Sequence, residues 1–353
     1  MSPEKIYQMQ EAMCSFYSHN QSNSIVGQSA QSIHYILMAR DRVECRELQN
    51  QLEGCSSEER NLIFNSLYSH LSDLVCDSSA NYVIQKLCEV INSEQQKLLL
   101  KFFLKNYQNI IKQPNGCRVL QKFIETTSKD NVEELFIALR SDLVELSFSL
   151  NGNHIVQRFI ECLPNRGEEI VQILKPQVSQ LVVDNCGCRV IQKLFGKMKI
   201  EQLRPIATEI LQYAKDLAKN QYGNYVVQNI LEAKQPEYIA YLIKSFTGHF
   251  YEFSTHKFAS NVIEKCIRGS TSQQRQIIFA DIIGPDDNYS IERIKNLVCD
   301  QFGNYVIQRI IEFGTESQKS IIYDVVYEFY YDFIHINYSK PVITRLITAG
   351  YEF

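Results

Sequence analysis

The chain has 353 residues and a formal net charge of −4, from 36 Lys and Arg against 40 Asp and Glu. Hydrophobic residues make up 45% and charged residues 22%, which is ordinary for a soluble globular protein, and the length fits two average domains or one elongated repeat array. The acidic balance by itself weighs against a nucleic-acid binder, which more often carries a basic excess, unless the positive charge is localised.

No segment of the sequence predicts secretion, membrane insertion, a cofactor or catalysis. The first twenty residues lack a basic start followed by an apolar run. The most apolar late stretch, 320–336, is interrupted by Asp324, Glu328 and Asp332, so we expect no membrane association. There is no HExxH motif, no phosphate-binding loop and no convincing Ser/His/Asp set, so we expect no enzyme.

Eleven cysteines without framework spacing favour reduced thiols in a cytosolic or nuclear protein. Cys186 and Cys188 are close in sequence, but no second Cys/His pair follows at ligand spacing. We therefore expect no metal.

Eight related segments follow one another at nearly constant spacing. In chain order they are ECRELQNQLE (44–53), ANYVIQKLCE (80–89), GCRVLQKFIE (116–125), GNHIVQRFIE (152–161), GCRVIQKLFG (187–196), GNYVVQNILE (223–232), ASNVIEKCIR (259–268) and GNYVIQRIIE (303–312). Their second residues lie 36, 36, 36, 35, 36, 36 and 44 residues apart. A fixed period is typical of a repeat protein, whereas an ordinary helical bundle does not require one.

Each segment has the apolar spacing of a helix. In NYVIQKLCEVI the residues Val83, Ile84, Leu87, Cys88 and Ile91 form one stripe. Another apolar stretch and a polar or glycine turn precede each segment, for example at 135–148. Helices joined by short turns and repeated at constant period build an all-α solenoid, because no single unit can bury its own apolar face.

The ends of the chain depart from the repeat. We assign residues 1–33 to an N-terminal cap, 34–328 to the eight repeats and 329–353 to a C-terminal cap. The last cap contains a degraded ninth copy, YSKPVITRLI (338–347), with Lys340 placed 36 residues after Asn304. The longer final interval predicts a loop at about 283–290, where Gly, Pro, Asp and Asn are turn formers.

Two polar positions break the apolar pattern of every segment. Counting from the second residue of each segment, the first and fifth positions stand about 40° apart on one helix face, and the second position points about 100° away. The residues at the first and fifth positions are Cys45/Gln49, Asn81/Gln85, Cys117/Gln121, Asn153/Gln157, Cys188/Gln192, Asn224/Gln228, Ser260/Glu264 and Asn304/Gln308. Both members of a pair can reach one object, and a polar row on successive helices is typical of a ligand-reading surface.

The chemistry of these pairs suits the edges of unpaired bases. A carboxylate only accepts hydrogen bonds, so Glu264 suits the two adjacent donors of guanine. Two amides suit uracil, which has one donor flanked by acceptors. A single Gln can satisfy the acceptor and donor of adenine, while a small Cys leaves room for the purine.

The second positions carry mostly planar groups. They are Arg46, Tyr82, Arg118, His154, Arg189, Tyr225, Asn261 and Tyr305. Except for Asn261, these are rings or guanidinium planes on which unstacked bases stack, worth roughly 1–3 kcal/mol per base. The alternative, that they only pack on neighbouring repeats, explains one Tyr more easily than eight aligned side chains.

The residue after the fifth position is cationic in six of the eight segments. The six are Lys86, Lys122, Arg158, Lys193, Lys265 and Arg309, and the other two are Asn50 and Asn229. Such a column localises positive charge beside the reading row, as phosphate neutralisation requires. Six solvated surface charges are the alternative.

Together these motifs resemble the Pumilio/PUF family of RNA-binding proteins. The segments GNYVIQ, GCRVIQ and FASNVIEK carry the resemblance, which covers nearly the whole chain. It implies a crescent-shaped α-solenoid of eight three-helix repeats with half-repeat caps, in which each repeat reads one base.

The family's code transfers position by position. The Asn/Gln repeats imply uracil, the Cys/Gln repeats adenine and the Ser/Glu repeat guanine. With the eighth repeat on the 5′ base, the implied target is 5′-UGUAUAUA-3′. Three departures are Glu44 and Glu47 in the first repeat, Ala80 in place of Gly in the second, and Asn229 in the basic column.

We therefore expect a monomeric, cytoplasmic protein that binds single-stranded RNA in mRNA 3′-UTRs containing UGUA. The resemblance implies repression or destabilisation of the mRNA through corepressors or a deadenylase complex on the convex face and near 283–290. Two alternatives stay open: a peptide-binding α-solenoid scaffold, and a low-specificity relative that acts in ribosome assembly.

Overall fold

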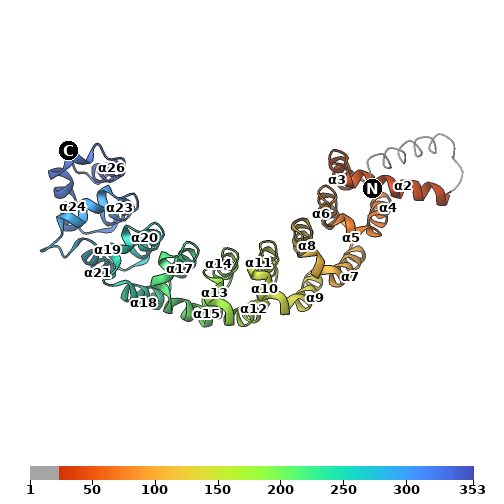
Figure 1. Cartoon of the computed structure of the whole chain (residues 1–353), viewed down its shortest axis with the longest axis horizontal. Coiled ribbons are helices and arrows are strands. Elements are labelled where there is room, and N and C mark those ends of the chain that lie inside the picture. The colour runs from red at the N-terminus through yellow and green to blue at the C-terminus, as the bar shows by residue number, and fades with distance from the viewer. Residues whose placement is uncertain (1–23) are drawn as a thin grey trace. The chain divides into compact units, whose positions relative to one another are not determined.

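The structure is a computed structural model that describes residues 24–353, with side chains from residue 30 onward. Every regular element in this range is a helix, which confirms the predicted all-α class (Figure 1). The chain divides into two compact units, residues 1–141 and 142–353. Most of the predicted N-terminal cap, 1–33, lies outside the described residues.

The described part of the first unit is built from helices of very different length. They are α2 (Ser24–Arg40), α3 (Glu44–Gly54), α4 (Ser57–Tyr68), α5 (Leu71–Leu74), α6 (Ala80–Val90), α7 (Ser93–Ile110), α8 (Pro114–Thr126) and α9 (Lys129–Leu139). The short 3₁₀ helix η1 (Arg140–Asp142) follows at the boundary of the unit.

The second unit continues the same alternation of helices. Its helices are α10 (Leu143–Phe148), α11 (Gly152–Cys162), η2 (Pro164–Arg166), α12 (Gly167–Leu174), η3 (Lys175–Gln177), α13 (Val178–Leu181), α14 (Gly187–Lys197), α15 (Ile200–Gln212), α16 (Ala214–Lys219), α17 (Gly223–Glu232), α18 (Pro236–Phe246), α19 (Phe250–Ser254), α20 (Ala259–Gly269), α21 (Ser272–Ile283), α22 (Ile291–Cys299), α23 (Gly303–Phe313), α24 (Glu316–Glu328), α25 (Tyr330–Phe333) and α26 (Lys340–Thr348).

The eight repeated segments form one row of helices in each unit, which we call the signature helices. They are α3, α6 and α8 in the first unit, and α11, α14, α17, α20 and α23 in the second. Successive signature helices pack against each other within each unit, and α26, the degraded ninth copy, packs on α23. The outer helices α4, α7 and α9, and α12, α15, α18, α21 and α24, run along the opposite side of their units (Figure 1).

The apolar stripe read from the sequence holds this arrangement together. In α6 the side chains of Val83, Ile84 and Leu87 are completely buried. Burying each such side chain contributes roughly 1.5–3 kcal/mol. The helix packs mainly against the signature helices on either side, α3 and α8. The solenoid is therefore stabilised by contacts between neighbouring repeats, as expected for units that cannot fold alone.

A polar side chain four residues before the first position closes the turn into most signature helices. Asp77 accepts hydrogen bonds from the backbone N–H groups of Ser79 and Ala80, both at 2.8 Å. Equivalent bonds are accepted by Asp41, Ser149, Asp184, Asn220, His256 and Asp300. These bonds satisfy N–H groups that a helix start leaves unpaired, and they fix the first position in space.

Close approach of two helices explains the glycine at the start of α23. A Cβ added at Gly303 would lie 2.8 Å from Leu297 Cδ2 and 3.0 Å from Leu297 Cα on α22. The equivalent residues in the first two repeats are Glu44, which is exposed, and Ala80, which is fully buried. The signature helix therefore sits closer to its preceding short helix in the eighth repeat than a larger side chain would allow.

The extra residues of the seventh repeat lie in the connection between α21 and α22. Gly284 has φ of +95°, a value that favours glycine, and the backbone N–H of Ser290 donates to Ile283 O at 2.7 Å. Within the described residues, no helix is both long and apolar enough to cross a bilayer.

Candidate nucleic-acid interface

The first-position residues lie deeper in the protein than the sequence pattern alone indicates. All eight are buried: Cys45, Asn81, Cys117, Asn153, Cys188, Asn224, Ser260 and Asn304. The fifth-position residues lie one turn later on the same helices. Gln228 and Gln308 are buried, and the other six are half-buried: Gln49, Gln85, Gln121, Gln157, Gln192 and Glu264. The face offered to a ligand is therefore formed mainly by the fifth and second positions.

Each first-position Asn is held by its own turn. Asn81 Nδ2 donates to the backbone carbonyls of Asp77 and Ser78 at 2.8 and 3.0 Å, and Asn81 Oδ1 accepts from Gln85 Nε2 at 2.9 Å. The same Gln-to-Asn bond recurs at Gln157/Asn153, Gln228/Asn224 and Gln308/Asn304, at 2.9, 2.9 and 3.1 Å.

This network decides which groups of the amide pair can face a base. Both N–H groups of Asn81 are used by the turn, so its remaining capacity is the second lone pair of Oδ1. Gln85 keeps one N–H and its carbonyl oxygen. The pair therefore presents acceptors together with one donor, held in a fixed orientation.

The first-position cysteines replace the amide with a short thiol. Cys117 Sγ donates to Ile111 O at 3.1 Å, and Cys45 and Cys188 make longer bonds of 3.5 Å to carbonyls of their own turns. Burial raises the pKa of the Cys117 thiol to about 12, so it stays protonated at neutral pH. These thiols act as small spacers beside the Gln and have no nucleophilic character.

The glutamines of these Cys/Gln repeats have surroundings that differ from those of the Asn/Gln repeats. Gln49 Nε2 donates to the backbone carbonyl of Cys45 at 2.9 Å. Gln121 and Gln192 are half-buried, and neither has a first-position amide to bond, because a thiol stands there. Burial raises the pKa of the Cys188 thiol, while the charge of Arg189 and a hydrogen bond with Gln192 act against that rise.

For Gln121 and Gln192 the structure shows which member of each pair is exposed. Helical spacing predicted that both members of each pair reach the ligand, as Cys117 with Gln121 and Cys188 with Gln192. The two thiols are buried and directed at turn carbonyls, as the first-position asparagines are. Gln121 and Gln192 remain as the partly exposed reading groups of α8 and α14.

All eight second-position side chains are exposed beside the fifth-position row: Arg46, Tyr82, Arg118, His154, Arg189, Tyr225, Asn261 and Tyr305. The three tyrosines expose 47, 53 and 52% of their surface. Partial desolvation, with the charges of Arg189 and Arg158, lowers the pKa of His154 and favours its neutral ring. The row therefore offers flat faces to stack against.

The basic column forms a ladder of ion pairs with glutamates at the ninth position. Four members pair with the ninth-position Glu of the preceding signature helix: Lys86 with Glu53 (2.5 Å), Lys122 with Glu89 (3.1 Å), Lys193 with Glu161 (2.6 Å) and Lys265 with Glu232. Arg158 and Arg309 pair with Glu161 and Glu312 on their own helices. The column is therefore largely neutralised within the protein.

The lone reading carboxylate has a different environment from the other readers. Glu264 exposes 21% of its side chain, and burial raises the pKa of its carboxyl. Arg309 acts in the opposite direction, with Arg309 Nε lying 3.4 Å from Glu264 Oε2. Glu264 is therefore a half-buried acceptor whose ionised form depends on a nearby arginine.

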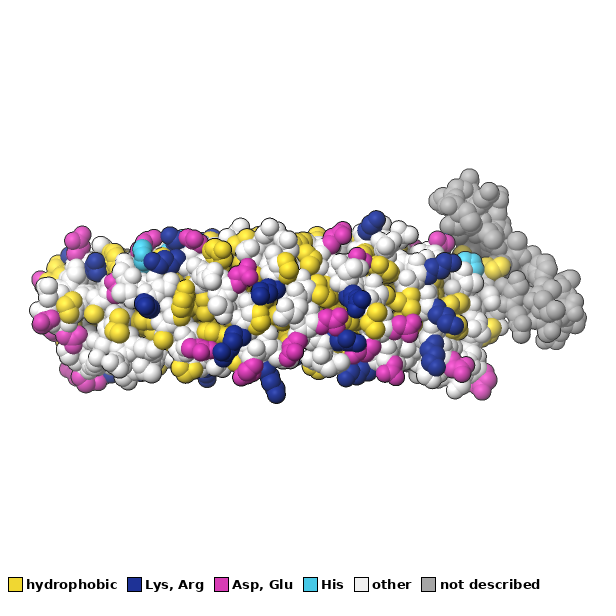
Figure 2. Space-filling view, turned by 90° about the horizontal axis from the view of Figure 1, so that it is seen from below, with side chains coloured by type: hydrophobic (Ala, Val, Ile, Leu, Met, Phe, Trp, Pro, Cys, Tyr) yellow, Lys and Arg dark blue, Asp and Glu magenta, His cyan; other side chains and the backbone are white. Residues whose placement is uncertain are grey.

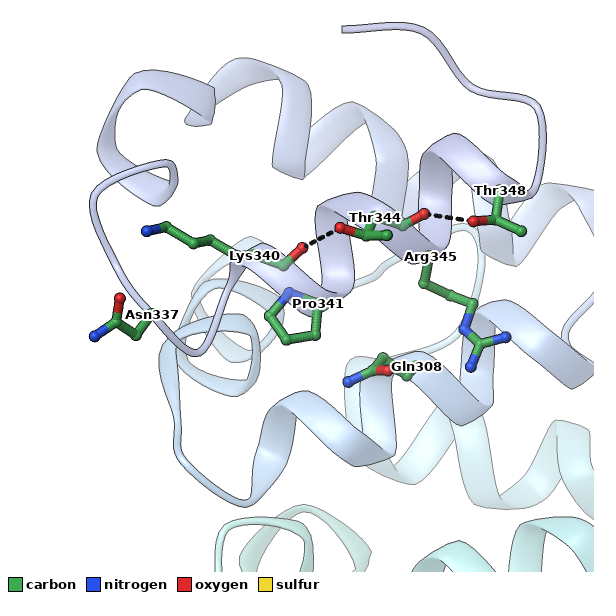
Figure 3. A pocket seen from close by; sticks show the side chains of 7 residues that line it. All are labelled: Gln308, Asn337, Lys340, Pro341, Thr344, Arg345 and Thr348. Carbon is green, nitrogen blue, oxygen red and sulfur yellow. Dashed lines mark hydrogen bonds between the residues drawn. The ribbon is translucent and has the colours of Figure 1, made fainter.

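A hollow of about 540 Å³ lies beyond the last reader, between α23 and the degraded ninth copy α26 (Figure 3). It is lined by Gln308, Asn337, Lys340, Pro341, Thr344, Arg345 and Thr348. The Thr344 and Thr348 hydroxyls donate to carbonyls one turn earlier, of Lys340 and Thr344. The hollow therefore continues the polar row past its predicted end.

Sequence reasoning missed two groups of residues that shape this surface: the turn-closing side chains and the ninth-position glutamates. Both recur with the period of the array, so the same alignment of segments would have shown them. On the face shown in Figure 2, acidic and basic side chains are interspersed, and no extended patch carries charge of a single sign. Among the described residues no cluster of metal-ligating side chains occurs.

The repeats match a known family throughout the array. The sequence model of the Pumilio-family RNA binding repeat matches residues 34–67, 70–101, 106–139, 142–174, 177–211, 213–245, 249–283 and 293–326. The chain therefore belongs to the Pumilio family of RNA-binding repeat proteins, which are not enzymes.

Curated relatives resemble the chain over most of its length. It is 29% identical over 311 residues to Pumilio homolog 12 of Arabidopsis thaliana, covering 87% of this chain and 51% of the relative. It is 30% identical over 333 residues to the suppressor protein MPT5 of Saccharomyces cerevisiae, covering 84% of this chain and 39% of the relative. The chain thus spans about half or less of the length of these relatives.

Solved structures share the fold. The structure of PUF-8 in complex with PBE-RNA aligns with a TM-score of 0.81 at 25% identity, over 99% of both chains. The Puf3 RNA binding domain bound to the Cox17 RNA 3′ UTR recognition sequence site B aligns with a TM-score of 0.82 at 27% identity, over 96% of this chain and 99% of that one. The predicted PUF-type α-solenoid is confirmed.

Proposed function

We propose that the protein binds single-stranded RNA in a sequence-specific manner, one base per repeat, with the target 5′-UGUAUAUA-3′. The observation that carries the proposal is the order of the first- and fifth-position pairs on eight equivalent signature helices. Read from α23 back to α11, the second unit specifies U, G, U, A and U. Read from α8 back to α3, the first unit specifies A, U and A.

The hydrogen-bond inventory of the three reader types supports this assignment. The Asn/Gln pair presents acceptors and one donor, which matches the single N–H of uracil and a neighbouring carbonyl. The Cys/Gln pair has a protonated spacer and one amide, such as that of Gln121 or Gln192, which matches the acceptor and donor of adenine. Glu264 supplies only acceptors, which matches the two N–H donors of guanine.

The exposed second-position groups supply the rest of the binding energy. Each base would lie between planar side chains of neighbouring repeats, a contact worth roughly 1–3 kcal/mol. Because the cationic column is already paired with glutamates, stacking and edge contacts contribute more here than phosphate neutralisation. Binding should accordingly depend less steeply on salt than six free phosphate contacts would require.

The cellular role follows from the proposed target. The protein would act in the cytoplasm on mRNAs that carry the element in their 3′-UTRs, and it would repress or destabilise them through recruited corepressors or a deadenylase complex. The Puf3 relative is seen bound to a 3′ UTR recognition sequence, which supports the class of target. The outer helices, which lie away from the reading row, leave surface for such partners.

Fluorescence anisotropy at a fixed, stated salt concentration tests the proposal. Three RNAs are compared: UGUAUAUA, the same RNA with G changed to A, and a scrambled control. We expect tight binding to the first, with the single change costing about 1–3 kcal/mol. Equal binding to all three would assign the protein to a low-specificity role, and binding to none would favour a peptide scaffold.

A variant of the lone acidic reader makes the test specific to the code. Glu264→Gln gives repeat 7 one donor and one acceptor, so it should convert a guanine reader into an adenine reader. The matched control is Gln228→Glu on α17, which should favour guanine at the third base. Unchanged guanine preference in Glu264→Gln would contradict the one-base-per-repeat assignment.

A further inference from the structure

The ion-pair ladder is interrupted between α20 and α23, beside the guanine reader. In four pairs of neighbouring signature helices, the sixth-position Lys reaches the ninth-position Glu of the preceding helix. On α20 the ninth position is Arg268, which is exposed and carries the wrong charge for this pairing. The sixth-position cation of α23, Arg309, therefore has no ladder partner on α20.

Arg309 contacts the reader itself instead. Its Nε lies 3.4 Å from Glu264 Oε2, one helical turn before the position occupied by Arg268, while its Nη1 pairs with Glu312 on α23. Arg309 exposes only 10% of its side chain. A buried guanidinium is thus fixed between two carboxylates, one of which is the proposed guanine acceptor.

The contact leaves the acceptor oxygens of Glu264 available. Arg309 Nε is buried and makes no hydrogen bond, although it is within ion-pair distance of Glu264. The arginine therefore stabilises the negative charge of the carboxylate without using up its lone pairs. A base with two adjacent N–H donors can still engage both oxygens.

Charge on this carboxyl matters because burial opposes it. Burial raises the pKa of Glu264, whereas Arg309 on α23 and Arg268 on α20 lower it and Glu312 on α23 raises it. Without Arg309, the remaining influences from α23 would favour the protonated form. A protonated carboxyl donates a hydrogen bond and would suit adenine N1 better than guanine N1–H.

We propose that Arg309 is a positioning residue for base recognition by the preceding repeat, so that the guanine preference of repeat 7 depends on a side chain of repeat 8. This inference rests on the proposed function. Recognition of the second base of the target then depends on both α20 and α23. The other fifth-position readers have no cationic partner of this kind among the ion pairs seen in residues 30–353.

The test compares Arg309→Met, Arg309→Lys and the control Lys193→Met. Lys193 occupies the same position on α14, but its partner on the preceding helix is Glu161, which is not a reader. The readout is the ratio of the dissociation constants for UAUAUAUA and UGUAUAUA, measured by anisotropy across pH 5 to 8. Thermal unfolding of each variant confirms that the compared proteins are folded.

Arg309→Met should lower this ratio on the order of tenfold, the size expected for coupling between contacting residues. It should also move the loss of guanine preference to higher pH. Arg309→Lys should keep both the ratio and the pH profile close to those of the wild type. Lys193→Met should leave the ratio unchanged, with any loss of affinity shared by both RNAs. In the Glu264→Gln background, Arg309→Met should not alter the ratio.

Two results separate failure of this inference from failure of the proposed function. If the wild type prefers guanine and Arg309→Met keeps the same ratio and pH profile, with or without a uniform loss of affinity, Arg309 has no positioning role. If the wild type binds both RNAs equally, the proposed function fails and the inference fails with it.

Discussion

Two pairs of neighbouring signature helices, α3 and α6 in the first unit and α20 and α23 in the second, use the same cationic position differently. In the first pair Lys86 reaches Glu53, which lies away from the reader Gln49. In the second pair Arg309 reaches Glu264, the reader itself. The difference follows from one residue, because the ninth position is Glu53 on α3 and Arg268 on α20. A repeat array can therefore hold a constant backbone pattern while one local charge changes what a reader can recognise.

The largest expected effect concerns how closely each signature helix packs on the helix before it. Gly303→Val should place a branched side chain against Leu297 and destabilise the protein by about 2 kcal/mol through overpacking. Urea unfolding measures the change. The matched substitution Glu44→Val, at the exposed equivalent position of α3, should cost less than about 1 kcal/mol. Equal losses at both sites would contradict the difference in packing.

Reversing the charge at position 268 should give α20 and α23 the ion-pair arrangement of α3 and α6. Arg268→Glu gives Arg309 the partner that Lys86 has in Glu53, so the guanidinium should leave Glu264 and the preference for guanine should fall about threefold. Competition binding with the two RNAs measures this ratio. The reverse exchange, Glu53→Arg, should cost roughly 0.2–1 kcal/mol of stability at most. It should not change base preference in the first repeats, since Gln49 carries no charge.

Acidification should act on the two pairs in opposite directions. The pKa of Glu89 is lowered by its bonds to Lys86 and Lys122, so its contribution to stability is present above the ordinary value of 4.5 and is lost as the pH falls below it. The pKa of Glu264 is raised by burial, so its folded form takes up a proton above 4.5, and folding stability rises slightly as the pH falls through that range.

Guanine preference should therefore weaken as the pH falls from 7 toward the ordinary carboxyl value of 4.5, before the ladder of the first unit is affected. The effect should be smaller than the tenfold change from removing Arg309, because Arg309 still favours the ionised form of Glu264. Anisotropy with the guanine and adenine RNAs in matched buffers checks it. Glu264→Gln, which cannot titrate, should show a flat profile, and a flat profile in the wild type would contradict the argument.

The sequence predicted the helices and their order because the period exposes both. Apolar residues at helical spacing identify one buried face, and eight copies remove the ambiguity of any single segment. The pattern also predicted that Tyr82 and its equivalents point away from the core, which the structure confirms through their exposure. Residue types at the first and fifth positions were sufficient to propose a base for each repeat.

The depth of each side chain could not be predicted in the same way. Helical spacing gives the direction of Asn81 around its own helix, but its burial depends on the turn that begins at Asp77 and on the neighbouring repeat. For the same reason the spacing could not show that Gln121 and Gln192 stay partly exposed while the cysteines one turn earlier are buried.

The helical pattern also could not predict which side chains contact each other between repeats. The pairing of Lys86 with Glu53 joins residues 33 positions apart, which one helix cannot show. The exception at Arg309 depends on the absence of a glutamate at Arg268, and only the packed arrangement shows where the arginine goes instead.

The hydrogen bonds that close each turn also bear on how readily the target could be changed. The start of α6 is bonded by the amide of Asn81, and the start of α14 is bonded by the thiol of Cys188. The residue before each helix has a similar backbone conformation, with φ −106° and ψ −47° at Ser79 and φ −92° and ψ −45° at Cys186. An amide and a thiol can therefore occupy the first position of a signature helix without a large change of the backbone conformation. The base preference of such an array can therefore be changed by substituting first-position side chains, provided that each new side chain still forms hydrogen bonds with the turn carbonyls.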